Sequence, residues 1–445
     1  MSFAQTQTEN LAALLKKYSD NPEKIREIAE EYRIEDIAEA LEELDEDTQI
    51  KVASALPTED IAELLSEIDE EESEDLIKNL DAMLLVDAVH EMSPDEIAEL
   101  VRELDPETAS LLLSKVENDK REDVCKLLNF PPDSAGSLMT PEIVVIPDHL
   151  TVAEALPIVK KQLEHAKIED RIFIVDKAGR PVGVISLAEL ILADLTEKVS
   201  KLVEDKPIVV KATDDREVAA NLALKYELRV VPVVDDTGKL IGAIPFDEIL
   251  YTVEEETEED MLKMVGASDP EEESPIKASL ARLPWLIVNL FGGLLAGNVI
   301  KLFQNVLSKS IALAFFVPVI TGMGGNAALQ TATTVVRGLA TGEVKLSEIW
   351  ETLFKEVVVA FFVGAGCALI AGSAALIMQG EIKITLIVGT AMFTAISIAA
   401  IVGTVLPMFF EKVGVDPAIA TGPFVTTSND IIGIFIYFTV AKILL

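Results

Sequence analysis

One carboxylate, Asp430, lies inside the last long apolar stretch of the 445-residue sequence, residues 418–445. That stretch is long enough to span a bilayer, which requires roughly 20 apolar residues. A charged side chain at the centre of a span costs about 2.5–3.5 kcal/mol, so it normally faces water, a partner charge or an ion. Pro423, Thr427 and Asp430 share one helical face by their spacing. We therefore predict a cation site at Asp430; the alternative is an aspartate hydrogen-bonded to a neighbouring helix.

Five apolar spans are expected, at about residues 283–303, 311–336, 357–378, 384–410 and 418–445. An odd number of spans places the two termini on opposite sides of the membrane. The sequence begins with polar residues and no signal peptide. We therefore expect a multi-pass protein of the inner (plasma) membrane, surrounded by membrane lipid, with cytoplasmic N-terminal domains and the C-terminus outside.

Polar residues recur at helical spacing in the second and fourth spans. Residues 318–325 carry a proline and three glycines, and we expect them to interrupt the second helix, which is tolerated beside a wet cavity. Asp416 followed by Pro417 is typical of a helix N-cap with proline at the first helical position. The residues predicted to line a water-filled pore are Asn326, Gln330, Thr334, Thr390, Thr394, Ser397, Pro423 and Thr427.

The nature of the ion follows from the side chains available. The expected spans offer one carboxylate per chain, with hydroxyls, amides and carbonyls, and no cluster of His or Met. Oxygen ligands suit hard cations, and Mg²⁺ keeps much of its hydration shell when few carboxylates bind it. A symmetric dimer would bring two Asp430 side chains to one axis. Mn²⁺, Co²⁺ and Ca²⁺ stay open as divalent cations.

Charge is distributed very unevenly along the chain. Residues 1–280 contain 68 Asp and Glu against 28 Lys and Arg, whereas residues 281–445 contain 8 against 9. An acidic surface repels nucleic acid and attracts cations. The composition predicts an acidic soluble region ahead of a membrane region, with no nucleic-acid partner; a halophile's or solubility-tuned surface is the alternative.

Residues 1–130 contain a repeat of short amphipathic segments, such as residues 36–45, 60–69 and 96–105. Ser93 followed by Pro94 is a clear helix start. Short helices of this kind bury one another's apolar faces in a stack. We predict an acidic helical repeat domain.

Residues 131–250 alternate strand-like and helical pieces in two similar copies. The recurring pattern of residues 173–186 and 233–245 resembles a CBS-domain pair. Such pairs often hold adenine nucleotides, and Ser186 with Glu189 matches the usual hydroxyl and acid of an ATP site in the first copy. Pro245 replaces that hydroxyl in the second copy. The alternative is a dimerising and gating module without a nucleotide.

A carboxylate-rich connector follows at residues 251–277. Apolar residues at helical spacing predict an amphipathic helix. Its like charges would be relieved by a bound cation, or the acids are simply a solvated face. The acids predicted to bind cytosolic cations are Asp247, Glu248, Glu254, Glu255, Glu258 and Glu259.

The whole arrangement, ending in a membrane domain at residues 278–445, resembles the MgtE family of magnesium transporters and channels. The resemblance rests on residues 318–327, residues 336–343 and the stretch from Asp416 to Asp430. Leu329 stands where relatives often carry Asn. The resemblance implies a multidomain membrane protein: an all-α helical repeat, an α/β CBS pair, a connecting helix and five transmembrane helices. It also implies a homodimer for Mg²⁺ uptake and homeostasis, an ion at Asp430, and closure when Mg²⁺ binds the cytosolic acids.

Two other functions stay open on the residues alone. A lone intramembrane aspartate would also serve an ion- or proton-coupled carrier of Mg²⁺, Co²⁺ or Mn²⁺. A membrane sensor or enzyme regulated by the CBS pair is the third reading. The sequence contains no evident nucleophile and base set, so we expect no enzymatic activity.

Overall fold

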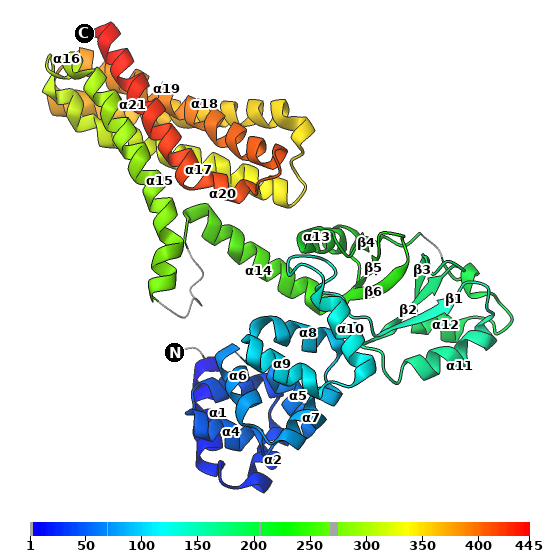
Figure 1. The fold of residues 1–445 in the computed structure, drawn as a ribbon. Coiled ribbons are helices and arrows are strands. Elements are labelled where there is room, and N and C mark those ends of the chain that lie inside the picture. Colours follow the sequence, from blue (N-terminus) through cyan, green and yellow to red (C-terminus); the bar gives the residue numbers. More distant parts are fainter. Residues whose placement is uncertain (1–2, 69, 204–205, 268–274) are drawn as a thin grey trace. The chain divides into compact units, whose positions relative to one another are not determined.

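The computed structural model describes residues 3–68, 70–203, 206–267 and 275–445 (Figure 1). The chain divides into two compact units, residues 1–253 and residues 254–445. Each unit is built around its own apolar core.

Short helices make up the N-terminal part of the first unit, as the repeat predicts. Ser93 caps α8 in a capping box with Glu96, and Asp105 caps α9, so each helix starts where a side chain accepts its free N–H groups. Apolar residues of these helices are buried in a common core, for example Ile61 and Ile97. The bounds are α1 (Phe3–Tyr18), α2 (Pro22–Glu31), α3 (Ile34–Glu42), α4 (Glu46–Ala53), α5 (Thr58–Glu67), α6 (Glu70–Asn79), α7 (Ala82–Glu91), α8 (Pro94–Glu103), α9 (Pro106–Lys115) and α10 (Asn118–Leu128).

Two similar α/β repeats complete this unit and confirm the predicted CBS arrangement. In each repeat the first strand pairs parallel with the second, and the second pairs antiparallel with the third. The sheets pack on each other through Phe173, Val230 and Ala243. The elements are β1 (Ile143–Pro147), α11 (Val152–Gln162), β2 (Ile168–Val175), β3 (Pro181–Ser186), α12 (Leu187–Leu192), η1 (Val199–Lys201), β4 (Val210–Lys211), α13 (Arg216–Tyr226), β5 (Val230–Val234) and β6 (Leu240–Pro245).

Residues 251–265 of the acidic connector lie in α14 (Phe246–Val265), a helix as their apolar spacing predicts, and this helix begins ahead of residue 251. Ile249 and Thr252 are buried, whereas most of its carboxylates are exposed. The acidic run at residues 271–273 lies outside the described residues.

Five segments in the second unit are long and apolar enough to cross a membrane: Pro275–Leu302, Ile311–Ala340, Leu346–Gln379, Ile382–Lys412 and Pro417–Leu444. Of these, α19 is the most enclosed and contacts α17, α18 and α21. The helices and turns are α15 (Pro275–Leu302), α16 (Gln304–Leu307), η2 (Ile311–Phe316), α17 (Val317–Ala340), η3 (Leu346–Glu348), α18 (Ile349–Gln379), α19 (Ile382–Lys412), α20 (Pro417–Thr421) and α21 (Pro423–Leu444).

One expectation about these spans is wrong. Residues 318–325 do not interrupt a helix, because Pro318 lies in the first turn of α17, where no intrahelical N–H is needed, and the helix continues through the glycines. The break occurs instead at Gly422, between α20 and α21. The helix of the third span, α18, begins at Ile349, ahead of the expected span, and carries Glu356 in a buried position.

Candidate cation site in the membrane domain

The segment that carries Asp430 starts with a cap and a break. Asp416 accepts a hydrogen bond from the backbone N–H of Ala418 at 2.7 Å, which confirms the predicted cap. Gly422 then separates α20 from α21, and a Cβ placed there would lie 2.7 Å from the carbonyl oxygen of Met264. The end of α14 therefore contacts the start of the last helix closely enough to require glycine.

Asp430 lies two turns into α21 and is half-buried. Within the described part of the chain, no hydrogen bond or ion pair reaches its carboxylate. Thr427, one turn earlier, packs against Gly292 of α15 and donates its hydroxyl hydrogen to the carbonyl of Pro423. The alternative for Asp430 is a hydrogen bond to a neighbouring helix. No such bond is found among the described residues.

Asn429 is a polar neighbour that the sequence analysis did not select. Its side chain is 1% exposed and packs against Gly324 of α17, where a Cβ would lie 2.7 Å from Nδ2. The Nδ2 group is buried without an acceptor among the described residues. A buried unpaired amide is costly, so Asn429 belongs with Asp430 as a candidate functional residue.

The predicted lining residues lie on three helices, α17, α19 and α21. Pro423 and Thr427 accompany Asp430 on α21, whereas Gln330 and Thr334 of α17 line a cavity that also contains Glu356 of α18. Asn326 and Thr390 are exposed on α17 and α19. The hydroxyls of Thr334, Thr394 and Ser397 donate to backbone carbonyls one turn earlier, at 2.8–3.0 Å. Their donors are satisfied within each helix, which leaves their oxygen atoms free to face a cation.

An ion-pair chain joins the end of α14 to the start of α20. Lys263 Nζ lies 2.9 Å from Asp416 Oδ2 and 2.6 Å from Glu259 Oε1. Burial and the neighbouring Asp416 raise the pKa of Asp260 to about 6. Glu259, a predicted cation ligand, is therefore engaged by a lysine here.

The other predicted cytosolic ligands are dispersed. Glu254, Glu255, Glu258 and Asp247 are exposed along α14. Glu248 is half-buried, and burial together with the nearby Glu99 raises its pKa to about 7. Across the described residues, no three His, Cys, Asp or Glu side chains gather closely enough to hold a metal ion. A site made from these acids would need a further group to complete it.

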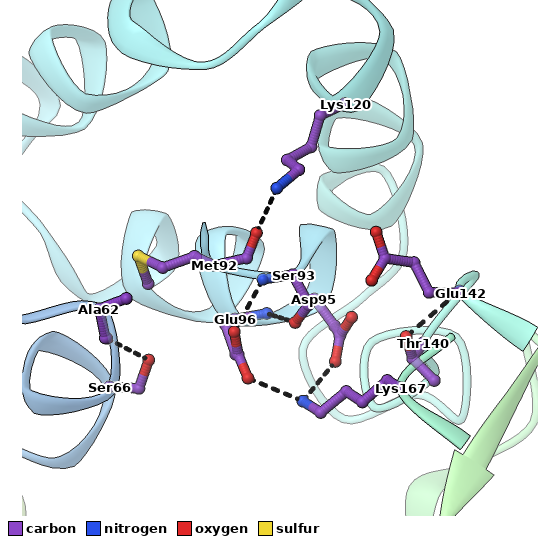
Figure 2. Close-up of polar contacts among 10 residues, drawn as sticks. All are labelled: Ala62, Ser66, Met92, Ser93, Asp95, Glu96, Lys120, Thr140, Glu142 and Lys167. Atoms are coloured by element: carbon purple, nitrogen blue, oxygen red, sulfur yellow. Dashed lines mark hydrogen bonds and ion pairs between the residues drawn. The ribbon is translucent and has the colours of Figure 1, made fainter. Parts of the chain in front are cut away.

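Lys167 forms an ion-pair cluster that the sequence analysis missed (Figure 2). Its Nζ lies 2.9 Å from Asp95 Oδ2 and 3.1 Å from Glu96 Oε1. Burial would raise the pKa of Glu96, but Lys167 and the N–H of Ser93 outweigh burial and hold that pKa below its usual value. The second oxygen of Asp95 is buried without a partner among the described residues. The lysine thus supplies the positive charge where α8 meets the first CBS repeat.

Ser186 and Glu189, the predicted nucleotide residues, form a capping box at the start of α12. Ser186 Oγ donates to Glu189 Oε2 at 2.9 Å, and the N–H of Glu189 donates to Ser186 Oγ at 3.1 Å. Their spacing is therefore explained by helix capping. A nucleotide would have to compete for these atoms.

Sequence comparisons match most of this architecture. The profile of the MgtE family, described as a divalent cation transporter, matches residues 317–440. The MgtE intracellular N domain matches residues 32–133, and CBS domains match residues 135–195 and 199–255. A magnesium transporter MgtE of Bacillus subtilis (strain 168) is 37% identical over 332 residues, covering 74% of this chain and 73% of the relative. The chain belongs to the MgtE family.

Other MgtE proteins support this assignment. A magnesium transporter MgtE of Thermus thermophilus is 34% identical over 73% of each chain. Among solved structures, the cytosolic domain of the Mg²⁺ channel MgtE in complex with ATP is 31% identical, with a TM-score of 0.52, over 54% of this chain and 99% of that one. With its five candidate spans, this MgtE family member is a multi-pass membrane protein.

Proposed function

We propose that this protein is a Mg²⁺ channel that closes when cytosolic Mg²⁺ is high. The proposal rests chiefly on Asp430, a carboxylate in a membrane span that no described side chain pairs with. It is supported by relatives named magnesium transporters and by a similar structure named a Mg²⁺ channel. An unpaired intramembrane carboxylate with hydroxyls and carbonyls nearby suits a hydrated hard cation.

We propose a homodimer as the working form. A single carboxylate balances only half the charge of a divalent ion, whereas two Asp430 side chains on a common axis would oppose a charge of +2 with −2. The N-terminal domains lie in the cytoplasm and the C-terminus outside in this proposal. Cross-linking in membranes, followed by mass measurement in detergent, should give twice the mass of one chain; an active monomer would exclude the dimer.

Gating is proposed to act through α14. Its last turn contacts Gly422, and Lys263 pairs with Asp416. A displacement of α14 would therefore also move the start of α21. Mg²⁺ bridging the acids of α14 to other cytosolic carboxylates would favour one position of this helix. Shifting such an equilibrium from 1:99 to 99:1 requires about 5.5 kcal/mol of differential binding, which several weak sites supply together.

ATP binding stays a prediction for this chain. The similar cytosolic structure was solved in complex with ATP, and Ser186 and Glu189 are the residues to substitute. Because both already cap α12, ATP would have to bind without losing that cap.

The experiment is a recording from excised patches with Mg²⁺ as the only permeant cation. We expect unitary Mg²⁺ currents that fall as Mg²⁺ on the cytosolic face rises. Uptake that requires an opposing or accompanying gradient of protons or Na⁺, without unitary currents, would instead establish a coupled carrier.

A further inference from the structure

A cavity with several polar side chains lies in the membrane domain, and Asp430 is not part of its lining. It measures about 240 Å³ and is bounded by α17, α18 and α19. Its polar lining consists of Gln330, Thr331 and Thr334 from α17 and Glu356 from α18, and its remaining walls are aliphatic. Among the described residues, α21 contributes nothing to this lining. The cavity is therefore separate from the face that carries Asp430.

Glu356 is buried because of where it lies on α18. Glu356, Ala360 and Gly364 follow one another at four-residue spacing on the face that packs against α19. Gly364 contacts Phe393 and Ile396 of α19, which fixes this face against its neighbour. The same face therefore carries a carboxylate into an otherwise apolar helix contact.

Among the residues that the structure describes, none forms an ion pair with the carboxylate of Glu356. Its residue is 8% exposed, and no hydrogen bond or ion pair to another described residue reaches it. Lys355 is exposed beside it in the sequence, and Arg337, one turn beyond Thr334 on α17, is exposed as well. A buried, unpaired charge is expensive unless water or an ion reaches it.

The facing turn of α17 supplies oxygen ligands. Thr334 donates its hydroxyl hydrogen to the carbonyl of Gln330 at 3.0 Å, so its lone pairs are available to the cavity. Thr331 is 8% exposed, and the side chain of Gln330 adds an amide oxygen. The volume holds several waters, since a water occupies about 30 Å³ in the liquid. One carboxylate, neutral oxygens and room for a hydration shell together match a hard divalent cation.

We propose that the cavity between α17, α18 and α19 binds a partly hydrated Mg²⁺ ion, with Glu356 as the charged ligand and Gln330, Thr331 and Thr334 as neutral ones. This inference rests on the proposed function, since it gives the transported cation a second binding position. The chemistry would accept Mn²⁺ or Co²⁺ as well.

The test measures cation occupancy by chemical protection of a cysteine at the cavity mouth. Val359 lines the cavity and is 49% exposed, whereas Phe362 on the same helix is 71% exposed and does not line it. In the full chain with Cys125→Ala and Cys367→Ala, Val359→Cys or Phe362→Cys is reconstituted in liposomes. Each is then treated with a cationic, membrane-impermeant methanethiosulfonate, with and without Mg²⁺ at constant ionic strength.

We expect Val359→Cys to react, and Mg²⁺ to slow its reaction at least fivefold. Phe362→Cys should be unreactive, because it lies outside the cavity at an exposed position of the span, where lipid is expected. Adding Glu356→Gln, which keeps the size of the side chain, should abolish the protection, and Glu356→Asp should retain part of it. The protection should persist with Asp430→Ala.

Four results would overturn the proposal: an unreactive Val359→Cys, a reaction that Mg²⁺ does not slow, protection that survives Glu356→Gln, or protection that disappears with Asp430→Ala. A reaction that Mg²⁺ does not slow is the result expected if the cavity holds only water, a proton or the Arg337 side chain. Mg²⁺ flux is measured on the same liposomes. Flux that survives Asp430→Ala contradicts the proposed function, whereas protection reports on the cavity alone, so the two failures are distinguishable.

Discussion

Lys263 Nζ lies 2.9 Å from Asp416 Oδ2, so residues 153 positions apart connect the end of α14 to the N-cap of α20. The same aspartate caps α20 through Ala418, and the break at Gly422 follows directly. The acidic connector thus ends on the segment that leads to Asp430. This contact is where a cytosolic signal would enter the membrane domain.

Replacing Lys263 with Gln should weaken closure by Mg²⁺. Removal of the ammonium leaves Asp416 and Glu259 without their partner, which loosens the contact of α14 with α20. We expect the inhibitory cytosolic Mg²⁺ concentration in excised patches to rise severalfold. Asp416→Asn should give a similar shift, and the double variant should add little to either. Lys412→Gln at the exposed end of α19 is the control and should leave the inhibitory concentration unchanged. Equal effects of Lys263→Gln and Lys412→Gln would show that the ion pair of Lys263 has no role in closure.

Replacing Gly292 with Ala should reduce Mg²⁺ flux although it removes no ligand. A Cβ at this position would lie 2.5 Å from Thr427 Cγ2, so α15 and α21 must separate or Thr427 must move. We expect flux into liposomes to fall at least fivefold. Gly293→Ala is the matched control, because nothing lies within 4 Å of its added Cβ. Equal flux in the two variants would show that Thr427 does not need its present position.

Replacing Lys167 with Met should destabilise the contact between α8 and the first CBS repeat. Asp95 and Glu96 would each lose a hydrogen bond from a charged donor. Such a bond contributes about 1.5–3 kcal/mol to stability. We expect hydrogen exchange to show a loss of about 2–3 kcal/mol in the opening free energy of α8. Added Mg²⁺ should restore more protection in this variant than in the wild type. Lys160→Met, at an exposed position of α11, should change neither value; unchanged protection in Lys167→Met would contradict the assigned role.

The start of α14 should become less stable as pH rises from about 4.5 to 7. The pKa of Glu248 is raised to about 7 by burial and by Glu99, so the folded state holds a proton that the unfolded state has released. Each unit of pKa corresponds to about 1.4 kcal/mol. Hydrogen exchange in residues 246–253, corrected for the intrinsic pH dependence, should show protection falling over this range. Glu248→Gln should remove the dependence and Glu254→Gln should keep it; a flat profile in the wild type would refute the burial of this carboxylate.

Sequence patterns were sufficient for the architecture because it depends on local properties. Repeated caps predict the short helices, alternating strand and helix pieces predict the CBS pair, and apolar length predicts five spans. The continuous α17 was mispredicted because Pro318 lies in the first turn, where its missing N–H costs nothing, and because glycines are tolerated in membrane helices. Glu356 was missed because the expected third span began one residue after it.

Contacts between distant residues were beyond the reach of these patterns. Lys167 and Lys263 are ordinary surface residues by sequence, and only the fold brings them to Asp95 and Asp416. Asn429 could have been selected from its position beside Asp430. Its unpaired amide, however, depends on the packing of α21 against Gly324.

The central claim is that Asp430 holds the permeating ion, and it is tested most directly by Mg²⁺ current through Asp430→Ala channels. The measurement uses excised patches with low cytosolic Mg²⁺, where the wild type is open, and normalises current to the amount of inserted protein. We predict a loss of current of at least a hundredfold, with insertion and dimer cross-linking unchanged. Wild-type current through an equally well inserted Asp430→Ala protein would contradict the account.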